Sequence, residues 1–363
     1  MPRKSDSRRT FCIFRVPQSL SETNQMAYQP NMVSIGPYHH GKPQFQKIQE
    51  HKRRFSIDLL NRTNQRRDKL KHFAKALKPM EENLRKCYSE ALAFDSDDDE
   101  LIEMMVLDGC FIIELFCKHY RKLVGHIHPG HDPLLTEPWF LQRPDDVLKK
   151  YSNWEGEHLL NFLRLTYNPD SPETKQRPHK FLRLIQPANK LRQAGIKFKP
   201  TNCESFMDIK FSNGVLEIPV LKFDDFMSCL LLNFVAFEQC HTGSSKHITA
   251  YATFMACLLN TPADAELLCD RKIIEKYFGT DEKIAHFFSN IGKDVFDIHK
   301  NYLCKVFQDV NTFKNTYFNT RWSLMSAVAT FILLALAAIQ SFFAVYAYYR
   351  PHSSPSPNPN PNP

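Results

Sequence analysis

The stretch WSLMSAVATFILLALAAIQSFFAVYAYY, from Trp322 to Tyr349, is the strongest structural signal in the chain. It holds 28 residues without a charged side chain, and Arg321 and Arg350 bracket it. A bilayer core of ~30 Å needs about 20 helical residues, so this stretch is long enough to span with some tilt. Trp322 and Tyr349 match the aromatic anchors found at membrane interfaces. The sequence therefore predicts a transmembrane helix over 321–349, with a buried helix of a soluble domain as the alternative.

The two ends of the chain differ from this helix in composition. Residues 350–363 are rich in Pro and Asn, which predicts a disordered tail. Residues 1–10, MPRKSDSRRT, are basic and polar and lack the apolar region of a secretory signal. The predicted organisation is a disordered N-terminus (1–10), a helical soluble domain (11–320), the membrane span (321–349) and the tail (350–363).

The charges beside the span predict its orientation. Lys305, Lys314 and Arg321 precede it, whereas Arg350 follows it. Positive residues collect on the cytosolic side of a membrane, so the large N-terminal domain is expected in the cytosol. The ten cysteines form no CxxC pair and mostly lie in apolar runs. This pattern is typical of free thiols in a reducing compartment, which agrees with that orientation.

Upstream of the span, the chain predicts a packed, mainly α domain. Its 43% hydrophobic residues and 29 Phe supply enough apolar area for helix-on-helix packing. The helical periodicity and its capping signals then give the main segments. We expect helices near 42–61, 66–94, 100–124, 145–167, 181–194, 224–238, 247–259, 263–277 and 280–291, with another leading from 295 into the membrane.

One segment, MDIKFSNGVLEIPVL, predicts a β-hairpin instead. With Asn213 and Gly214 as a two-residue turn, Phe211 faces Leu216 and Ile209 faces Ile218, so the apolar side chains share one face. Lys210 then opposes Glu217, which is a favourable cross-strand pair. Pro219 predicts that its strand lies at a sheet edge. The fold class is therefore mainly α: a multi-helix globular domain with one small β-hairpin, followed by a single C-terminal transmembrane helix.

The net charge of +8 is concentrated in one segment, Lys42–Lys86. It carries 14 Lys and Arg against five Asp and Glu, an excess of nine positive charges. Two interpretations are open: solvated outer faces of amphipathic helices, or a surface for a protein partner or anionic lipid. The sequence contains no nucleic-acid-binding motif, so no nucleic acid is expected as a partner.

No familiar catalytic or cofactor motif occurs in the chain. It lacks GxG, the P-loop, GxSxG, HExxH and the EF-hand loop. HIHPGH, with His126, His128 and His131 beside Asp132, has metal-like residue types, but these crowd into one Pro-Gly loop, whereas structural zinc ligands usually come from separated segments. We predict no catalytic residue, no cofactor and no metal site.

The stretch VSIGPYHHG raises a separate question, because two of only 11 glycines flank adjacent histidines. Pro37 disfavours the helical region for Gly36, and Gly41 is free to adopt a positive φ. We interpret these residues as a rigid structural turn before the basic helix, with its aromatic rings packed on the core. The turn consists of Gly36, Pro37, Tyr38, His39, His40 and Gly41.

Several long motifs resemble one plant-specific family, the domain of unknown function numbered 247, also called a UPF-type plant protein family. They include NQMAYQPNMVSIGPYHHGKPQFQKIQEHKRRF, MMVLDGCFIIELF, NGVLEIPVLKFDD, NFVAFEQC and ITAYATFMACLLNTPAD, in the family order. The resemblance implies a mostly helical domain with one C-terminal membrane anchor and no established catalysis. The chain departs from the family at 145–163, where an acidic-Asn-Gln motif is missing.

The sequence thus suggests a membrane-anchored, single-pass plant protein rather than an enzyme. Its expected role is protein–protein interaction, recognition or signalling. The alternative is an unrecognised, hydrolase-like enzyme that uses Cys, His and carboxylate groups.

Overall fold

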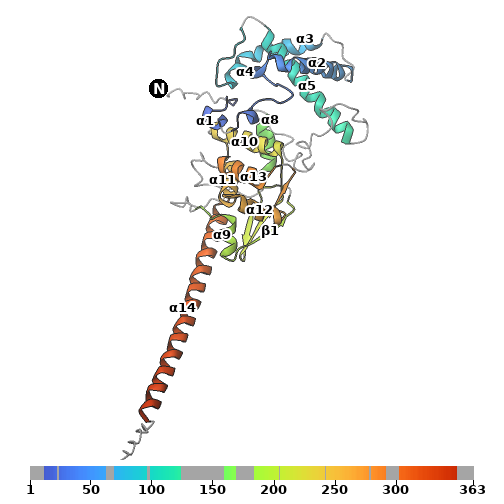
Figure 1. Cartoon of the computed structure of the whole chain (residues 1–363). Helices are drawn as coiled ribbons and strands as arrows, with labels where there is room; N and C mark the ends of the chain where they lie inside the picture. The colour runs from blue at the N-terminus through green and yellow to red at the C-terminus, as the bar shows by residue number, and fades with distance from the viewer. Residues whose placement is uncertain are drawn as a thin grey trace, which may run out of the picture.

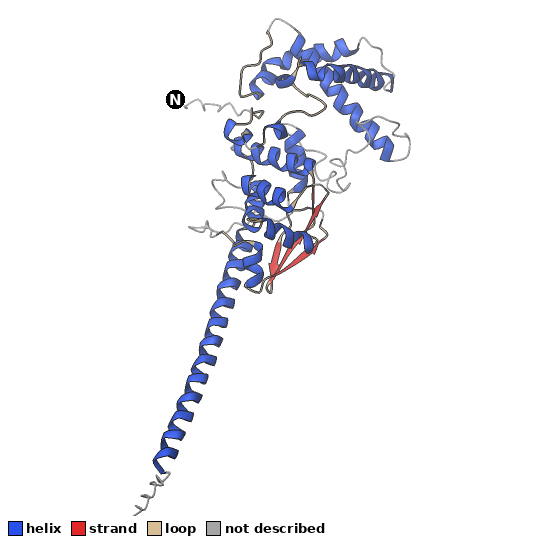
Figure 2. Cartoon of the chain, in the orientation of Figure 1, coloured by secondary structure: helices blue, strands red, loops and turns tan. Residues whose placement is uncertain are grey.

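The computed structural model describes residues 12–22, 24–62, 69–95, 99–123, 159–168, 184–203, 205–241, 243–277, 279–291 and 302–349. Within these residues the fold is mainly α, as the sequence predicts, and the few short strands gather on one side (Figure 2). Figure 1 shows three parts in a row: a helical group, a central body and one long helix that leaves the body.

The helical group, called the distal group below, lies at the end of the molecule away from the long helix (Figure 1). It consists of α2 (Gln46–Arg62), α3 (Lys69–Leu77), α4 (Glu81–Cys87) and α5 (Glu100–Leu123). It has its own small core, in which Leu59 packs with Ile102, Val106 and Cys110.

The sequence predicts one helix over 66–94, but the structure contains two. The short 3-10 turn η4 (Lys78–Met80) separates α3 from α4. Pro79 interrupts the predicted helix, because proline lacks an N–H donor and its ring clashes with the preceding helical turn.

The N-terminal segment connects the distal group with the central body. It contains α1 (Gln18–Ser21) and the 3-10 turns η1 (Gln25–Tyr28), η2 (Pro37–His39) and η3 (Pro43–Phe45). Ile13 forms a parallel bridge with Tyr88, just after α4. The Ala27 carbonyl accepts a hydrogen bond of 3.0 Å from Nδ2 of Asn233 in the central body.

The central body is built around a buried helix. Its helices are α8 (Leu159–Tyr167), α9 (Ala188–Gln193), α10 (Asp225–Cys240), α11 (His247–Leu258), α12 (Pro262–Asp270) and α13 (Asp281–Ile291). Residues 248–255 of α11 are all buried, consistent with a sequence there, ITAYATFM, that carries no charge. Thr261 and Asp264 form the capping box that starts α12, at the helix start predicted from the sequence.

Two small sheets cover one side of the central body. Their strands are β1 (Lys197–Thr201), β2 (Lys210–Ser212), β3 (Val215–Pro219), β4 (Leu221–Phe223) and β5 (Ile274–Lys276). The first sheet has the order β1-β3-β2, and the second pairs β4 with β5 in parallel. The predicted hairpin is the antiparallel pair of β2 and β3.

The central register of this hairpin is confirmed. Lys210 pairs with Glu217 and Phe211 pairs with Leu216. Asn213 and Gly214 have φ of 49° and 76°, as a tight two-residue turn with positive φ requires. The side chains of Lys210 and Glu217, however, form ion pairs with other residues. Lys210 Nζ lies 2.7 Å from Asp208 Oδ2, and Lys199 Nζ lies 3.0 Å from Glu217 Oε1.

Two finer expectations for the hairpin are wrong. The ladder begins at Lys210 rather than extending to Ile209, whose N–H donates to the Met207 carbonyl at 2.8 Å. The strand that contains Pro219 is central, because β1 pairs with its other side. The β2–β3 ladder stops at the pair Lys210–Glu217, so no residue of β2 lies opposite Pro219. Pro219 is tolerated in β3 because no carbonyl of β2 needs the N–H that proline lacks.

The parallel pairs are features that the sequence analysis missed. The predicted helix over 263–277 stops at Asp270, and Ile274–Lys276 instead pairs with Leu221–Phe223. The predicted helix over 181–194 begins only at Ala188, after Pro187. Gly195, with φ of 84°, follows this helix as predicted.

Helix α14 (Cys304–Tyr349) continues from the core of the central body into its apolar half. Near its start, the Phe307 ring is buried 5.4 Å from the ring of Phe254. From Met325 to Tyr346, 22 residues are long and apolar enough to cross a membrane, with none of the stretch buried. Figure 1 shows this half extending alone, away from the other elements.

Candidate functional site

The turn from Gly36 to Gly41 leads into the distal group. Gly36 has φ of 79° and ψ of −179°, a conformation that is essentially restricted to glycine. Pro37 to His39 then form η2, and Gly41 has φ of 73°. The two glycines therefore bracket a short helical turn whose entry and exit both need a positive φ.

A buried ion pair fixes this turn to two helices. Asp108 of α5 accepts a hydrogen bond of 2.8 Å from the Gly36 N–H on one carboxylate oxygen. Its other oxygen contacts Nζ of Lys52 on α2, which also donates to the Ser34 carbonyl. Both charged side chains are buried. The turn, α2 and α5 thus share one polar cluster, and each charge has a partner.

The aromatic residues of the turn contact the surrounding chain. The Tyr38 and Tyr88 rings meet edge to face with centroids 5.5 Å apart, and the Arg15 guanidinium carbon lies over the Tyr38 ring, 4.5 Å from its centroid. His39 Nδ1 lies 2.8 Å from Lys42 Nζ. Partial burial and then the charges of Lys42 and Arg15 lower the pKa of His39, so this imidazole is neutral at pH 7.

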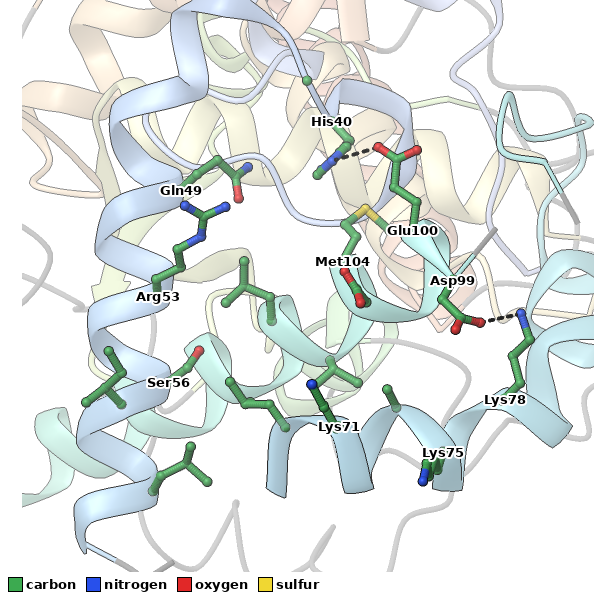
Figure 3. A pocket seen from close by; sticks show the side chains of 18 residues that line it. His40, Gln49, Arg53, Ser56, Lys71, Lys75, Lys78, Asp99, Glu100 and Met104 are labelled. Atoms are coloured by element: carbon green, nitrogen blue, oxygen red, sulfur yellow. Dashed lines mark ion pairs between the residues drawn. The ribbon is translucent and has the colours of Figure 1, made fainter. Parts of the chain in front are cut away.

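His40 and Gly41 form one rim of a cleft of about 930 Å³ in the distal group (Figure 3). The cleft lies between α2, α3 and the first turns of α5. Figure 3 shows Arg53 of α2 and Lys71 of α3 extending into it, with Met104 of α5 on the side opposite Arg53. Its apolar lining consists of Ile57, Leu60, Leu70, Ala74, Met104, Val106 and Leu107.

The charges of the cleft are divided between its walls. Arg53, Lys71 and Lys75 line the α2 and α3 side, and none of them forms an ion pair within the described residues. On the α5 side Asp99 pairs with Lys78 at 2.7 Å, Glu100 lies 3.9 Å from His40 Nε2, and Glu103 also lines the cleft. This arrangement suits a ligand that carries negative charge beside apolar groups.

The cleft holds few groups for covalent chemistry. No cysteine lines it, and the hydroxyl of Ser56 donates to the Lys52 carbonyl of its own helix at 2.8 Å. Elsewhere burial raises the pKa of the thiols of Cys257 and Cys269 to about 11, which keeps them protonated. Binding is therefore the property that this geometry supports most directly.

The other residues singled out from the sequence lie apart from the cleft. Arg321 and Trp322 are in the middle of α14, and Tyr349 is its exposed last residue. Arg350, the histidine-rich loop at 126–132 and the predicted disordered ends at 1–10 and 350–363 lie outside the described residues. In the part of the chain that is described, no group of three His, Cys, Asp or Glu is placed to hold a metal ion.

Sequence reasoning missed both Asp108 and the cleft. Asp108 was visible as a carboxylate within an apolar run, but its partner Lys52 is 56 residues away. The cations of the cleft belong to the basic segment Lys42–Lys86. Helical periodicity alone does not show that Lys71 and Lys75, rather than other lysines of this segment, line a cleft.

Comparison with known proteins identifies relatives in plants. A family model described as a plant protein of unknown function, DUF247, matches residues 13–149 and 136–336. A UPF0481 protein of Arabidopsis thaliana is 33% identical, and the alignment covers 95% of this chain and 88% of the relative. A putative UPF0481 protein of the same plant is 21% identical, with 93% and 91% covered. No solved structure matches the chain significantly.

Proposed function

We propose that this chain, which belongs to the DUF247 family of plant proteins of unknown function, is a membrane-anchored recognition or signalling component. Its anchor is the apolar half of α14. Its binding site is the distal cleft, which takes an acidic, partly apolar segment of a protein partner.

The observation that carries the anchor is the contrast between the two halves of one helix. Residues such as Phe307 and Val310 are buried in the central body, whereas Phe331, Leu333 and Leu334 are between 65% and 73% exposed. So much uninterrupted exposed apolar surface is unfavourable in water and favourable in lipid. The helix also ends with exposed Tyr348 and Tyr349, residue types that favour the membrane interface.

The cysteines support a cytosolic position for the large domain. All ten are free. A protein that retained so many thiols in an oxidising compartment would risk forming disulfides, whereas cytosolic thiols are kept reduced. The positive residues before the span favour the same orientation.

Removal of the apolar half of α14 tests the anchor. A chain that ends after Thr320 keeps the part of α14 that packs on the central body but loses residues 325–346. We expect this chain to leave the membrane pellet in alkaline carbonate, whereas the full chain remains in it. A chain that ends after Arg350 is the matched control and is expected to pellet. Retention of the shorter chain in the pellet would refute the anchor.

The role of the cleft is supported by its unpaired cations. Lys71 and Lys75 have no ionic partner in the described residues and lie beside apolar lining. Because α2, α3 and α5 lie at the end of the molecule away from the apolar half of α14, this cleft lies far from the proposed membrane (Figure 1). That position favours a protein partner over a lipid of the same membrane.

Charge reversal tests the cleft. A photo-crosslinking residue at Gln49, which lines the cleft, is expected to give a discrete product in membranes from the source plant. Lys71→Glu with Lys75→Glu should reduce that product about tenfold, because each 1.4 kcal/mol of lost attraction is a factor of ten. Lys222→Glu with Lys283→Glu, on exposed residues of the central body, is the matched control. An undiminished product in the cleft variant would exclude an acidic partner there.

A further inference from the structure

We propose a second binding surface: the hollow beside β1 binds phosphate-bearing headgroups of anionic lipids in the bilayer that α14 enters. This inference rests on the proposed membrane anchor and identifies a lipid class that the anchored domain would contact.

The hollow has a volume of about 450 Å³ and is positively charged. Four cations line it, Arg192, Lys197, Lys199 and Arg271, and none of its lining residues is a carboxylate. This composition differs from the distal cleft, whose lining includes Asp99, Glu100 and Glu103. A concave surface with one sign of charge concentrates the opposite charge near it.

Most of these cations lack an internal partner. Lys199 pairs with Glu217 at 3.0 Å, but that lysine side chain is 63% exposed. Arg192, Lys197 and Arg271 form no ion pair within the described part of the chain. Their mutual repulsion is therefore relieved only by solvent or by a bound anion. Arginine also matches the geometry of phosphate oxygens, with which it forms paired hydrogen bonds.

The backbone adds one donor to the same hollow. Strand β1 is an edge strand, because the sheet order is β1-β3-β2. Lys197 donates its N–H to the Gly214 carbonyl at 2.9 Å, which is the side of β3. Successive residues of a strand alternate in direction, so Phe198 directs its N–H away from β3, whereas Pro200, the other residue of β1 with this parity, has no N–H. This edge therefore offers one backbone N–H beside the cations.

The position of the hollow favours lipid as the source of phosphate. The hairpin next to β1 packs on α14, where a Cβ at Gly214 would lie 2.6 Å from the Phe313 ring. The rings of Phe211 and Phe313 are 5.8 Å apart. Figure 1 shows α9 and β1 at the end of the central body from which α14 leaves, opposite the distal group. The cations thus lie on the side of the body that faces the proposed membrane.

The distance along the helix allows the contact. From Phe313 to the first residue of the apolar stretch, Met325, a rise of 1.5 Å per residue gives about 18 Å. Headgroups extend roughly 5–8 Å beyond the hydrocarbon core on each side. The remaining gap of about 10–13 Å is longer than the Debye length of ~8 Å at physiological ionic strength, and an ordinary helix tilt of about 20° shortens it on one side of the body.

The test uses the full-length chain in nanodiscs of phosphatidylcholine, with or without phosphatidylserine. The acylation rate of individual lysines is measured by mass spectrometry. We expect acylation of Lys197 to slow about threefold or more in the anionic nanodiscs, and added salt to reverse the effect. Lys71 and Lys75, in the distal cleft, serve as internal controls whose rates should not depend on the lipid.

Substitutions distinguish binding at this hollow from a nonspecific attraction of the whole domain to anionic lipid. Arg192→Gln with Arg271→Gln should abolish the protection of Lys197, whereas Arg53→Gln in the distal cleft should leave it intact. Equal rates in both lipids, or equal slowing at Lys71, would overturn the proposal. Equal protection by inorganic phosphate in neutral nanodiscs would assign the hollow to a soluble ligand instead.

The outcome also distinguishes this inference from the anchor. Co-elution of the chain with the nanodisc is measured first. A chain that fails to co-elute contradicts the anchor and, with it, the lipid surface. A chain that co-elutes without protection at Lys197 leaves the anchor in place and overturns the lipid surface alone.

Discussion

The Asp108→Ala variant is expected to lose about 3–5 kcal/mol of unfolding free energy in the distal group, the cost of breaking a buried ion pair by removing one partner. Lys52 would lose its carboxylate partner in a buried site, with the Ser34 carbonyl as its remaining acceptor. The Gly36 N–H would also lose its acceptor. The turn and helices α2 and α5 should therefore loosen together.

Hydrogen exchange on the full-length chain in detergent micelles measures this effect. Amides of α2, α5 and the turn should exchange faster, while those of α11 should not change. The matched control is Asp58→Ala, because Asp58 and Lys118 join the same two helices at 2.5 Å but Asp58 is 38% exposed. Exposed pairs contribute about 0–1 kcal/mol, so the control should be mild. Equal effects of the two substitutions would contradict the role assigned to Asp108.

The Glu238→Ala variant is expected to destabilise the central body by a similar amount, about 3–5 kcal/mol. The Glu238 carboxylate is fully buried and accepts a hydrogen bond of 3.1 Å from Arg164 Nη1. It also accepts the N–H groups of Ile248 and Thr249 at the start of α11, at 3.1 and 2.8 Å. Its removal leaves a buried guanidinium without its carboxylate and two helix N–H groups without an acceptor.

The reverse substitution, Arg164→Met, should cost less. Burial raises the pKa of Glu238, and the hydrogen bonds from Thr249 and the charge of Arg164 offset only part of that rise. Without Arg164 the carboxyl group is free to bind a proton and become neutral, whereas an arginine left alone stays charged. Glu238→Ala is therefore expected to lower the unfolding free energy more than Arg164→Met does.

A double-variant cycle completes this prediction. Arg164→Met with Glu238→Ala should cost less than the sum of the singles, because no unpaired charge remains. Urea unfolding of the full-length chain in micelles, followed by circular dichroism, gives the three free energies. Glu217→Ala, which removes an exposed pair with Lys199, is the control for loss of a carboxylate. Additive single effects would show that the pair is not coupled.

Much of the local structure follows from residues that are near one another in sequence. The hairpin register was predictable because Asn213-Gly214 fixes the turn and the alternating apolar residues fix the faces. The start of α12 was predictable because Thr261, Pro262 and Asp264 all act within one helical turn. The apolar half of α14 was predictable from composition alone.

The sites depend on contacts between distant parts of the chain. Nothing near Asp108 in the sequence specifies Lys52 or Gly36 as its partners, and Arg164 is 74 residues from Glu238. The basic segment Lys42–Lys86 was evident as a charge excess, but its placement decides which cations meet a cleft. In the same way, Arg192 and Arg271 come from separate elements and only the fold brings them to one hollow.

The sequence by itself determined the mainly α class, the hairpin turn, the helix caps and the apolar C-terminal helix. These features arise from backbone preferences and hydrophobic periodicity, which act over one or two turns of chain. Only the tertiary structure decided the parallel strand pairs, the buried partners of Lys52 and Glu238, and the two concavities, one in the distal group and one beside β1. The physical reason is that a buried charge or strand edge is stabilised by whichever distant group the packed chain brings to it, and local sequence does not encode that choice.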